Sequence, residues 1–410
     1  MRTCCCARVG RLAFVLLGFA TLAAVQRPVR AVDFDSAKLA AIPAKMQEFV
    51  DQQHLAGAVT VVGTRDGIVS CEAVGRQNLE NAQPMAKNSL FRIASMTKPI
   101  TALGVMLLVD EGKLSVDDAV QKYLPEFRGQ LLLASRTPEL VTLKKPSRPI
   151  TIRDLLTHTS GLPGFPEGLA DLYAARNRTL AEGVLAVSQQ PLQFEPGSKW
   201  AYCNTGIDTL GRIIEVVSGQ AYEAFLKQRV FDPLGMTDTT FYPSAEQLPR
   251  VAMTYDRKDG KLVAAGGHII GPTAGAKYPI PAGGLYSTGA DLAKLYQLML
   301  GRGVLGDQRI LSEHSVATMT TVQTADLPCG FVPGMSFGFG WAVVKQPEGV
   351  TGMLSSGTFG HGGAFGTQGW IEPQRGVFYI LLIQRVGLPN GDASDMRREF
   401  QSLAAAAIKP

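Results

Sequence analysis

A serine and a lysine lie three residues apart at the start of an apolar stretch. They are Ser95 and Lys98, and the residues from Ile100 to Val109 are apolar nearly all round. On a helix this spacing places the two side chains about 4.5 Å apart along the axis, with Lys98 leaning back over Ser95. A serine hydroxyl becomes a nucleophile when a nearby group takes its proton. Burial and the helix N-terminus both favour a neutral lysine, so Lys98 could be that base. The alternative is that Lys98 reaches solvent from the first helical turn.

A phenol and an amide follow about one hundred residues later. Tyr202 and Asn204 flank Cys203 just ahead of a helical pattern. A phenol can relay a proton to a leaving group, and an amide can orient Lys98 or a substrate carbonyl. The alternative is that Tyr202 is a half-buried aromatic residue and Asn204 an ordinary helix cap. Cys203 is expected to be a small buried residue.

The third element is a glycine-rich stretch near the C-terminus. His361, Gly362 and Gly363 precede a predicted strand, and glycines let a substrate approach the backbone closely. The backbone amide of Ala364 could then pair with that of Ser95 to hold an oxyanion. The alternative is a glycine-rich turn with an incidental histidine.

Taken in chain order, S-x-x-K, Y-x-N and H-G-G resemble the three motifs of the serine β-lactamase and penicillin-binding superfamily. The stretches "DLLTHTSGLP" and "YCNTGIDTLGRIIEVVSG" are also similar to that group. The most similar branches are class C β-lactamases, the D-alanyl-D-alanine carboxypeptidases related to them, and β-lactamase-like esterases. The resemblance extends from about Asp33 to the C-terminus.

The resemblance implies an acyl-enzyme mechanism without metal or cofactor. In it Ser95 is the nucleophile, and Lys98 and Tyr202 share the acid–base work. The binding residues it implies are Asn204, which positions substrate, His361, Gly362 and Gly363, which line the cleft, and Ala364, whose amide completes the oxyanion hole with that of Ser95.

The third element departs from the class C pattern, which has K-T-G where this chain has H-G-G. A histidine with a pKa near ~6.5 is mostly neutral at pH 7, so the case for anionic substrates weakens. Without a second lysine the phenolate form of Tyr202 is also costly, which favours neutral Lys98 as the base and Tyr202 as the relay. The predicted function is a serine hydrolase acting on small esters or amides. The alternatives are a D-Ala-D-Ala carboxypeptidase or class C-type β-lactamase, and a non-catalytic penicillin-binding-like scaffold.

A second serine motif competes with Ser95. Residues 334–338 fit G-x-S-x-G, the nucleophile elbow of α/β-hydrolases, with Ser336 at its centre. That elbow needs a buried parallel strand before it and a helix after it. Here a loop precedes the motif and a strand-like pattern follows, so we expect Ser336 not to be the nucleophile.

The periodicity predicts an α+β fold. Strand patterns occur at both ends of the chain and helical patterns in the middle, so the two ends are expected to form one antiparallel sheet flanked by helices. The mainly helical lobe is then an insertion. The predicted boundaries are 32–90 and 270–410 for the α/β lobe and 91–269 for the helical lobe, with 128–149 as an irregular excursion.

The N-terminus is predicted to be a cleaved signal peptide, residues 1–31, which implies a periplasmic or secreted protein. Three arginines precede an apolar run from Leu12 to Val25, which is shorter than the ~20 residues of a spanning helix. No stable membrane anchor is expected after cleavage. The segment holds five of the 40 basic and none of the 35 acidic residues, so 40 − 5 = 35 basic residues balance 35 acidic ones. This neutrality gives no electrostatic case for nucleic acid binding; the expected partner is a small acyl substrate.

Overall fold

The computed structural model describes residues 1, 32–165, 171–266, 271 and 275–410. The predicted signal peptide therefore lies outside the described residues, apart from Met1. The predicted boundary between 269 and 270 also falls outside them, and the division into two lobes stays a prediction. Among the described residues, no helix combines the length and the apolar character needed to cross a membrane.

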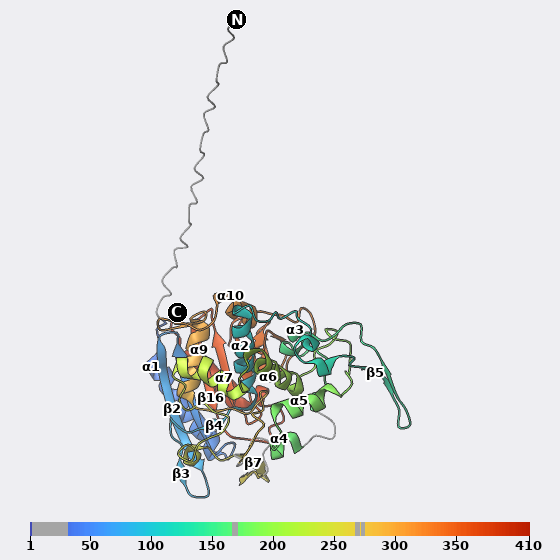
Figure 1. The fold of residues 1–410 in the computed structure, drawn as a ribbon. Coiled ribbons are helices and arrows are strands. Elements are labelled where there is room, and N and C mark those ends of the chain that lie inside the picture. Colours follow the sequence, from blue (N-terminus) through green and yellow to red (C-terminus); the bar gives the residue numbers. More distant parts are fainter. Residues whose placement is uncertain (2–31, 166–170, 267–270, 272–274) are drawn as a thin grey trace. The chain divides into compact units, whose positions relative to one another are not determined.

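A large antiparallel sheet joins the two ends of the chain, as the sequence predicts. Within the described residues it has eight strands in the order β12-β13-β14-β15-β16-β1-β2-β3. Strand β1 from the N-terminal part pairs with β16 from the C-terminal part, Val59 opposite Leu382. Figure 1 shows these segments side by side, blue against red. The strands are β1 (Gly57–Thr64), β2 (Gly67–Asn78), β3 (Gln83–Pro84), β12 (Met335–Phe337), β13 (Ala342–Val344), β14 (Phe359–Gly362), β15 (Gln368–Glu372) and β16 (Val377–Leu382).

Helices cover both faces of this sheet because its strands are apolar on both sides. Along β16, Phe378, Ile380 and Leu382 face one core, and Val377, Tyr379 and Leu381 face the other, which is the two-residue alternation of a strand. Helices α1 (Ser36–Asp51) and α11 (Asp395–Ala406) pack together on one face, and α9 (Gly289–Leu300) packs on the other. The predicted fold class is confirmed.

The apolar stretch after Ser95 forms helix α2 (Thr97–Asp110), preceded by a 3-10 turn, Ala94–Met96. Residues on every side of α2 are buried, as its uniform apolar pattern predicts. Helices of the middle part surround it, and the longest of them is α6 (Asn204–Ser218), which packs directly against α2. The other helices are α3 (Ile152–Leu156), α4 (Asp171–Ala175), α5 (Leu180–Ser188), α7 (Tyr222–Leu226), α8 (Asp232–Leu234) and α10 (Glu313–Thr320).

The excursion predicted to be irregular contains a hairpin instead. Strands β5 (Leu132–Arg136) and β6 (Val141–Lys144) pair antiparallel around a turn closed by Thr137 and Leu140, and Figure 1 shows this arm projecting beyond the helices. Every residue of β6 is exposed. Apart from Leu132 and Leu133 the residues of the two strands are exposed, so the hairpin has no continuous buried face, on which strand prediction from periodicity depends. The remaining short strands are β4 (Phe91–Arg92), β7 (Tyr255–Lys258), β8 (Lys261–Ala264), β9 (Tyr286–Ser287), β10 (Val304–Leu305) and β11 (Gln308–Arg309).

Candidate active site

Ser95 and Lys98 meet at the N-terminal end of α2. Lys98 Nζ lies 3.0 Å from Ser95 Oγ, which is hydrogen-bonding distance. Ser95 is half-buried in the 3-10 turn, whereas Lys98 is 0% exposed in the first turn of the helix. The alternative in which Lys98 reaches solvent is therefore wrong. Ala94, directly before Ser95, has a φ of 46°, a left-handed conformation that costs energy for a residue with a Cβ and that surrounding packing must maintain.

The Lys98 ammonium is held by neutral partners. Besides Ser95, Nζ donates to the backbone carbonyl of Ala282 at 2.6 Å and lies 4.6 Å from the centre of the Tyr202 ring. Among the ion pairs of the described residues, none includes Lys98. Burial lowers the pKa of Lys98 to about 7, and the negative charge of Asp208 offsets part of this effect. The amine is therefore partly neutral near pH 7 and able to accept a proton.

Tyr202 joins the same group from the segment that leads into α6. Its hydroxyl hydrogen-bonds to Ser95, and burial raises the pKa of the phenol well above its ordinary value, against the smaller effect of that hydrogen bond. The ring is half-buried. Tyr202 is thus placed to pass a proton as a neutral phenol, and the phenolate is disfavoured.

His158 holds the Tyr202 segment in position. Its backbone carbonyl accepts from the amide of Ala201 at 2.9 Å, and its Nδ1 accepts from the amide of Cys203 at 3.2 Å. The imidazole centre lies 4.7 Å from the Tyr202 ring. Burial, followed by the charge of Lys98, lowers the pKa of His158 well below its ordinary value. A neutral imidazole therefore packs beside the phenol.

The helix cap considered for Asn204 is made by Cys203, which is buried, as expected. The side chain that caps α6 belongs to Cys203, whose Sγ accepts from the amide of Gly206 at 3.3 Å. Asn204 is the first residue of the helix, half-buried, and its side chain has no hydrogen bond within the described residues. Its amide is free to bind a ligand. Cys71, Cys203 and Cys329 are all free thiols.

The H-G-G element begins in the last residues of β14 and precedes β15, as the sequence predicts. His361 pairs with Gly369 of β15, and its Nδ1 lies 2.6 Å from the carbonyl oxygen of Gly362. Burial, followed by the charge of Lys98, lowers the pKa of His361 to about 4. The imidazole is therefore neutral at pH 7. Its centre lies 6.0 Å from that of Tyr202, so the third element faces the first two.

Gly363 brings β14 close to the turn that carries Ser95. A side chain at this position would collide with Thr367 and with the backbone carbonyl of Ile93, two residues before Ser95. The glycine is thus required by packing as well as by access. Neither the Ser95 amide nor that of the exposed Ala364 donates a hydrogen bond within the described residues. Both remain available as donors to an oxyanion.

A family model described as Beta-lactamase matches residues 42–404. The chain belongs to the Beta-lactamase family. The resemblance drawn from the three motifs is confirmed, and the fold and the relatives agree that the protein is a serine hydrolase.

The chain is also similar to individual relatives and to solved structures. Protein Rv1367c of Mycobacterium tuberculosis is 34% identical over 360 residues, which cover 83% of this chain and 88% of that protein. Esterase EstB of Burkholderia gladioli is 30% identical over 383 residues, covering 86% and 92%. The solved structure of EstCE1, titled a hydrolase with promiscuous acyltransferase activity, has a TM-score of 0.74 and 24% identity, covering 90% of this chain and 99% of that one; it shows the shared fold.

The competing serine has the surroundings of a structural residue. Ser336 lies in β12, pairs across to Val343 of β13, and is 0% exposed. Its hydroxyl is 2.9 Å from that of Thr324. The strand is antiparallel and leads into another strand, so the elbow of an α/β-hydrolase is absent at this place. Ser95, and not Ser336, is therefore the candidate nucleophile of this Beta-lactamase family member.

Asp208 is a site residue that the sequence patterns did not indicate. It is 1% exposed, lies on α6 one turn after Asn204, and accepts from the amide of Ala282 at 2.9 Å. Its position four residues after Asn204 was an available signal, since such residues share a helix face. The signal is weak because a carboxylate on a helix is usually solvated.

Proposed function

We propose that the protein hydrolyses small esters or amides through an acyl-enzyme on Ser95, with neutral Lys98 as the base. The observation that carries the proposal is the 3.0 Å contact between Lys98 Nζ and Ser95 Oγ, made by a fully buried lysine. With its pKa lowered to about 7, a large share of Lys98 is neutral at that pH. An amine in this state accepts a proton without the energetic cost that an ordinary lysine would meet.

In the first step Ser95 Oγ forms a bond to the substrate carbonyl carbon, and its proton moves to Lys98 Nζ. The carbonyl oxygen becomes an oxyanion, which the amides of Ser95 and Ala364 stabilise. The bond to the leaving group then breaks, and the leaving oxygen or nitrogen takes a proton from the Tyr202 hydroxyl, to which the Lys98 ammonium returns one. Water next bonds to the acyl carbon while its proton passes through Tyr202 to Lys98. The bond from that carbon to Ser95 Oγ breaks, Oγ takes the proton back, and the acid is released.

The absence of a positive charge at the H-G-G element favours neutral substrates. His361 is uncharged at pH 7 because its pKa is lowered to about 4, so no fixed cation stands where class C enzymes have lysine. The surroundings of Tyr202 are aromatic: the ring centre of Phe331 is 4.9 Å away, and Trp200 packs on Phe337 at 5.0 Å. An apolar wall beside an uncharged site suits a small uncharged ester.

A D-Ala-D-Ala carboxypeptidase is the second candidate, and one cation favours it. Arg397 lines a small cavity together with His361 and Trp370. The guanidinium carbon lies 4.1 Å from the Trp370 ring centre, and Asp392 Oδ1 is 3.8 Å from Nη1. A peptide carboxylate could interact with this guanidinium. Asp392 offsets the charge, which ranks this function below ester hydrolysis.

Intact-mass spectrometry after exposure to a panel of acyl donors tests the proposal. The panel is a p-nitrophenyl short-chain ester, a cephalosporin and a D-Ala-D-Ala peptide. We expect an acyl adduct from the ester, absent in Ser95→Ala and retained in the matched control Ser336→Ala. An adduct that persists in Ser95→Ala would refute the assignment, and labelling by the peptide alone would favour the carboxypeptidase.

We also propose that the protein is exported to the periplasm or secreted. The support is the charged and apolar N-terminal segment with small residues near Ala31. Expression of the full chain with a C-terminal tag, fractionation and mass measurement test this. A shortened chain outside the cytoplasm is the expected result, and full-length protein confined to the cytoplasm contradicts it.

A further inference from the structure

Asp208 and Lys98 both bind the backbone of Ala282, through two adjacent peptide groups. The amide of Ala282 donates to Asp208 Oδ1 at 2.9 Å, and the carbonyl of Ala282 accepts from Lys98 Nζ at 2.6 Å. Asp208 and Lys98 are both buried, on α6 and α2. The backbone of one residue therefore links a carboxylate to the amine that contacts Ser95.

The turn that carries Ala282 is rigid. The amides of Gly283 and Gly284 both bind the carbonyl of Ile280, at 2.8 and 2.7 Å. Ile280 itself has a φ of 58°, which is an outlier for a β-branched residue and persists only where surrounding contacts impose it. The bond from Ala282 to Asp208 is one such contact.

Two tyrosines stabilise the carboxylate of Asp208. The hydroxyls of Tyr173 and Tyr278 both donate to Oδ2, the second at 2.9 Å. These bonds lower the pKa of Asp208, but burial acts more strongly and raises it to about 6. Above that pH the side chain is a buried anion. Besides Lys98, the titratable groups that interact with Asp208 are Tyr173, Cys203, Tyr222 and Tyr278.

The amine of Lys98 has titratable neighbours on several elements. Asp208 on α6 and Cys203 at the N-cap of that helix favour its charged form. His158 after α3 and His361 on β14 lie within electrostatic reach and are kept neutral by burial and by Lys98 itself. Tyr202 presents its ring to the amine and stays a neutral phenol. Asp208 is thus a buried negative charge set against this amine.

We propose that Asp208 is a positioning residue for Lys98: by holding the backbone of Ala282 it aims Nζ at Ser95, and its negative charge keeps the protonated amine stable during the reaction. This inference rests on the proposed function. The bond from the Ala282 amide to Asp208 fixes the orientation of this residue, and with it the direction in which the Ala282 carbonyl faces Lys98. The ammonium formed when Ser95 loses its proton is then stabilised in an apolar site.

The pH dependence of serine labelling tests this role. The second-order rate of labelling by a fluorophosphonate is measured from pH 5 to 9 in the full-length protein and in Asp208→Asn. Wild type should show an acid limb near pH 7, where Lys98 loses its proton. Removing the anion makes the ammonium less stable, so the limb in Asp208→Asn should move to lower pH by about 0.5 to 1 unit. The rate on the plateau should fall about tenfold because Nζ is less well aimed.

Two further variants keep the test decisive. Tyr173→Phe removes one hydrogen-bond donor to Asp208 and so makes its carboxylate form less stable. The acid limb should therefore move in the same direction as in Asp208→Asn, by a smaller amount. This variant replaces Asp208→Asn in the test if the latter does not fold. Asp154→Asn is the control: Asp154 is also a buried carboxylate, but it pairs with Arg148 and not with the groups around Ser95. The acid limb of this variant should stay at the wild-type pH. Folded Asp208→Asn or Tyr173→Phe with the wild-type limb would overturn the inference. Absence of Ser95-dependent labelling in wild type would instead overturn the proposed function.

Discussion

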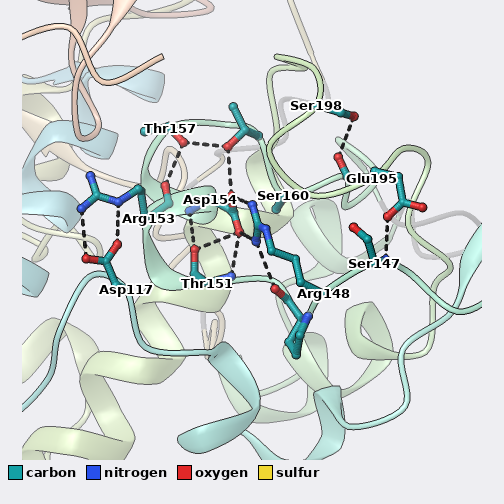
Figure 2. A network of polar contacts seen from close by, with 12 residues as sticks. Asp117, Ser147, Arg148, Thr151, Arg153, Asp154, Thr157, Ser160, Glu195 and Ser198 are labelled. Carbon is teal, nitrogen blue, oxygen red and sulfur yellow. Dashed lines mark hydrogen bonds and ion pairs between the residues drawn. The ribbon is translucent and has the colours of Figure 1, made fainter. Parts of the chain in front are cut away.

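Two networks of polar side chains lie among the helices, and they treat charge in opposite ways. In the first, Arg148 makes two contacts with Asp154, at 2.6 and 2.9 Å. Asp154 also accepts from the amide and the hydroxyl of Thr151 at 2.8 Å, and Figure 2 shows these bonds converging on one carboxylate. In the second network Lys98 has a hydroxyl and a carbonyl as partners, and the carboxylate of Asp208 binds the backbone amide of the residue that supplies that carbonyl.

The consequence is visible in the direction of the pKa shifts. Pairing with Asp154 raises the pKa of Arg148 above its ordinary value, whereas burial lowers that of Lys98 to about 7. A directly paired cation keeps its charge at every relevant pH. A buried cation with neutral contacts can lose its proton, and that is the property a base requires. The first network stabilises the fold, and the second leaves a proton mobile.

The largest expected effect is on the rate of acylation. Lys98→Ala should reduce ester-dependent acylation of Ser95 by about a thousandfold, because the base is lost and a cavity replaces it. Arg148→Ala is the control from the other network and should leave the rate within about twofold. Acylation is measured in a stopped-flow instrument as the release of p-nitrophenol. A rate near that of wild type in Lys98→Ala would show that Lys98 is not the base.

The next effect is on stability and concerns the paired network. Asp154→Asn should lower the free energy of unfolding by about 2 kcal/mol, because Asp154 is the buried partner of the pair, and an amide at this position places its own donor opposite the donors of Arg148. Urea unfolding monitored by circular dichroism measures this change. An unaltered urea midpoint would mean that the ion pair contributes nothing to the fold.

In the network around Lys98 a substitution is expected to raise the free energy of unfolding, by a smaller amount. Lys98→Met should stabilise the protein at pH 7 by about 1 kcal/mol, since a buried amine is replaced by an apolar side chain of similar length. The folded-state pKa of about 7 is below the ordinary value of 10.5, so between these pH values the unfolded chain binds the extra proton. Wild-type stability should therefore rise from pH 7 towards 10.5.

The variant Lys98→Met lacks this titration, so its advantage over wild type should shrink as the pH rises through that window. Paired urea titrations at pH 7 and pH 9.5 give the comparison. An advantage that is constant between the two values would contradict the lowered pKa.

The smallest expected effect is that of replacing Ser336, whose surroundings differ from those of Ser95. Ser95 faces an amine that can lose its proton, whereas Ser336 faces the hydroxyl of Thr324 at 2.9 Å. Ser336→Ala should cost about 1 kcal/mol of stability and leave the hydrolysis of p-nitrophenyl esters within about twofold. A large loss of hydrolysis in a well-folded Ser336→Ala protein would reopen the role of that serine.

Local patterns predicted the elements that bury a continuous face or close a cap. Helix α2 and strands β1 and β16 follow from their apolar periodicity, and Thr151 with Asp154, three residues later, forms the capping box at the start of α3. The similar pair Ser115 and Asp118 makes its bond at 2.9 Å, yet only 3-10 turns follow at Val120–Lys122 and Pro125–Phe127. Ala119 is drawn into a bridge with Thr151, and this tertiary contact overrides the local signal.

The sequence by itself determined which groups meet and which of them is buried. A lysine in the first turn of a helix that is apolar on every side has no route to solvent, because each face of that helix must pack against other residues. The three motifs likewise carry their chemistry in their own residue types.

Only the tertiary structure decided how the buried amine is held. Its carbonyl partner, Ala282, is 184 residues away, and Asp208 binds the backbone amide of that same residue. Backbone groups are identical along the chain and leave no mark in residue type or spacing. Which carbonyl accepts from Lys98, and which carboxylate stands behind it, depends on the packing of α6 and the 280–284 turn against α2.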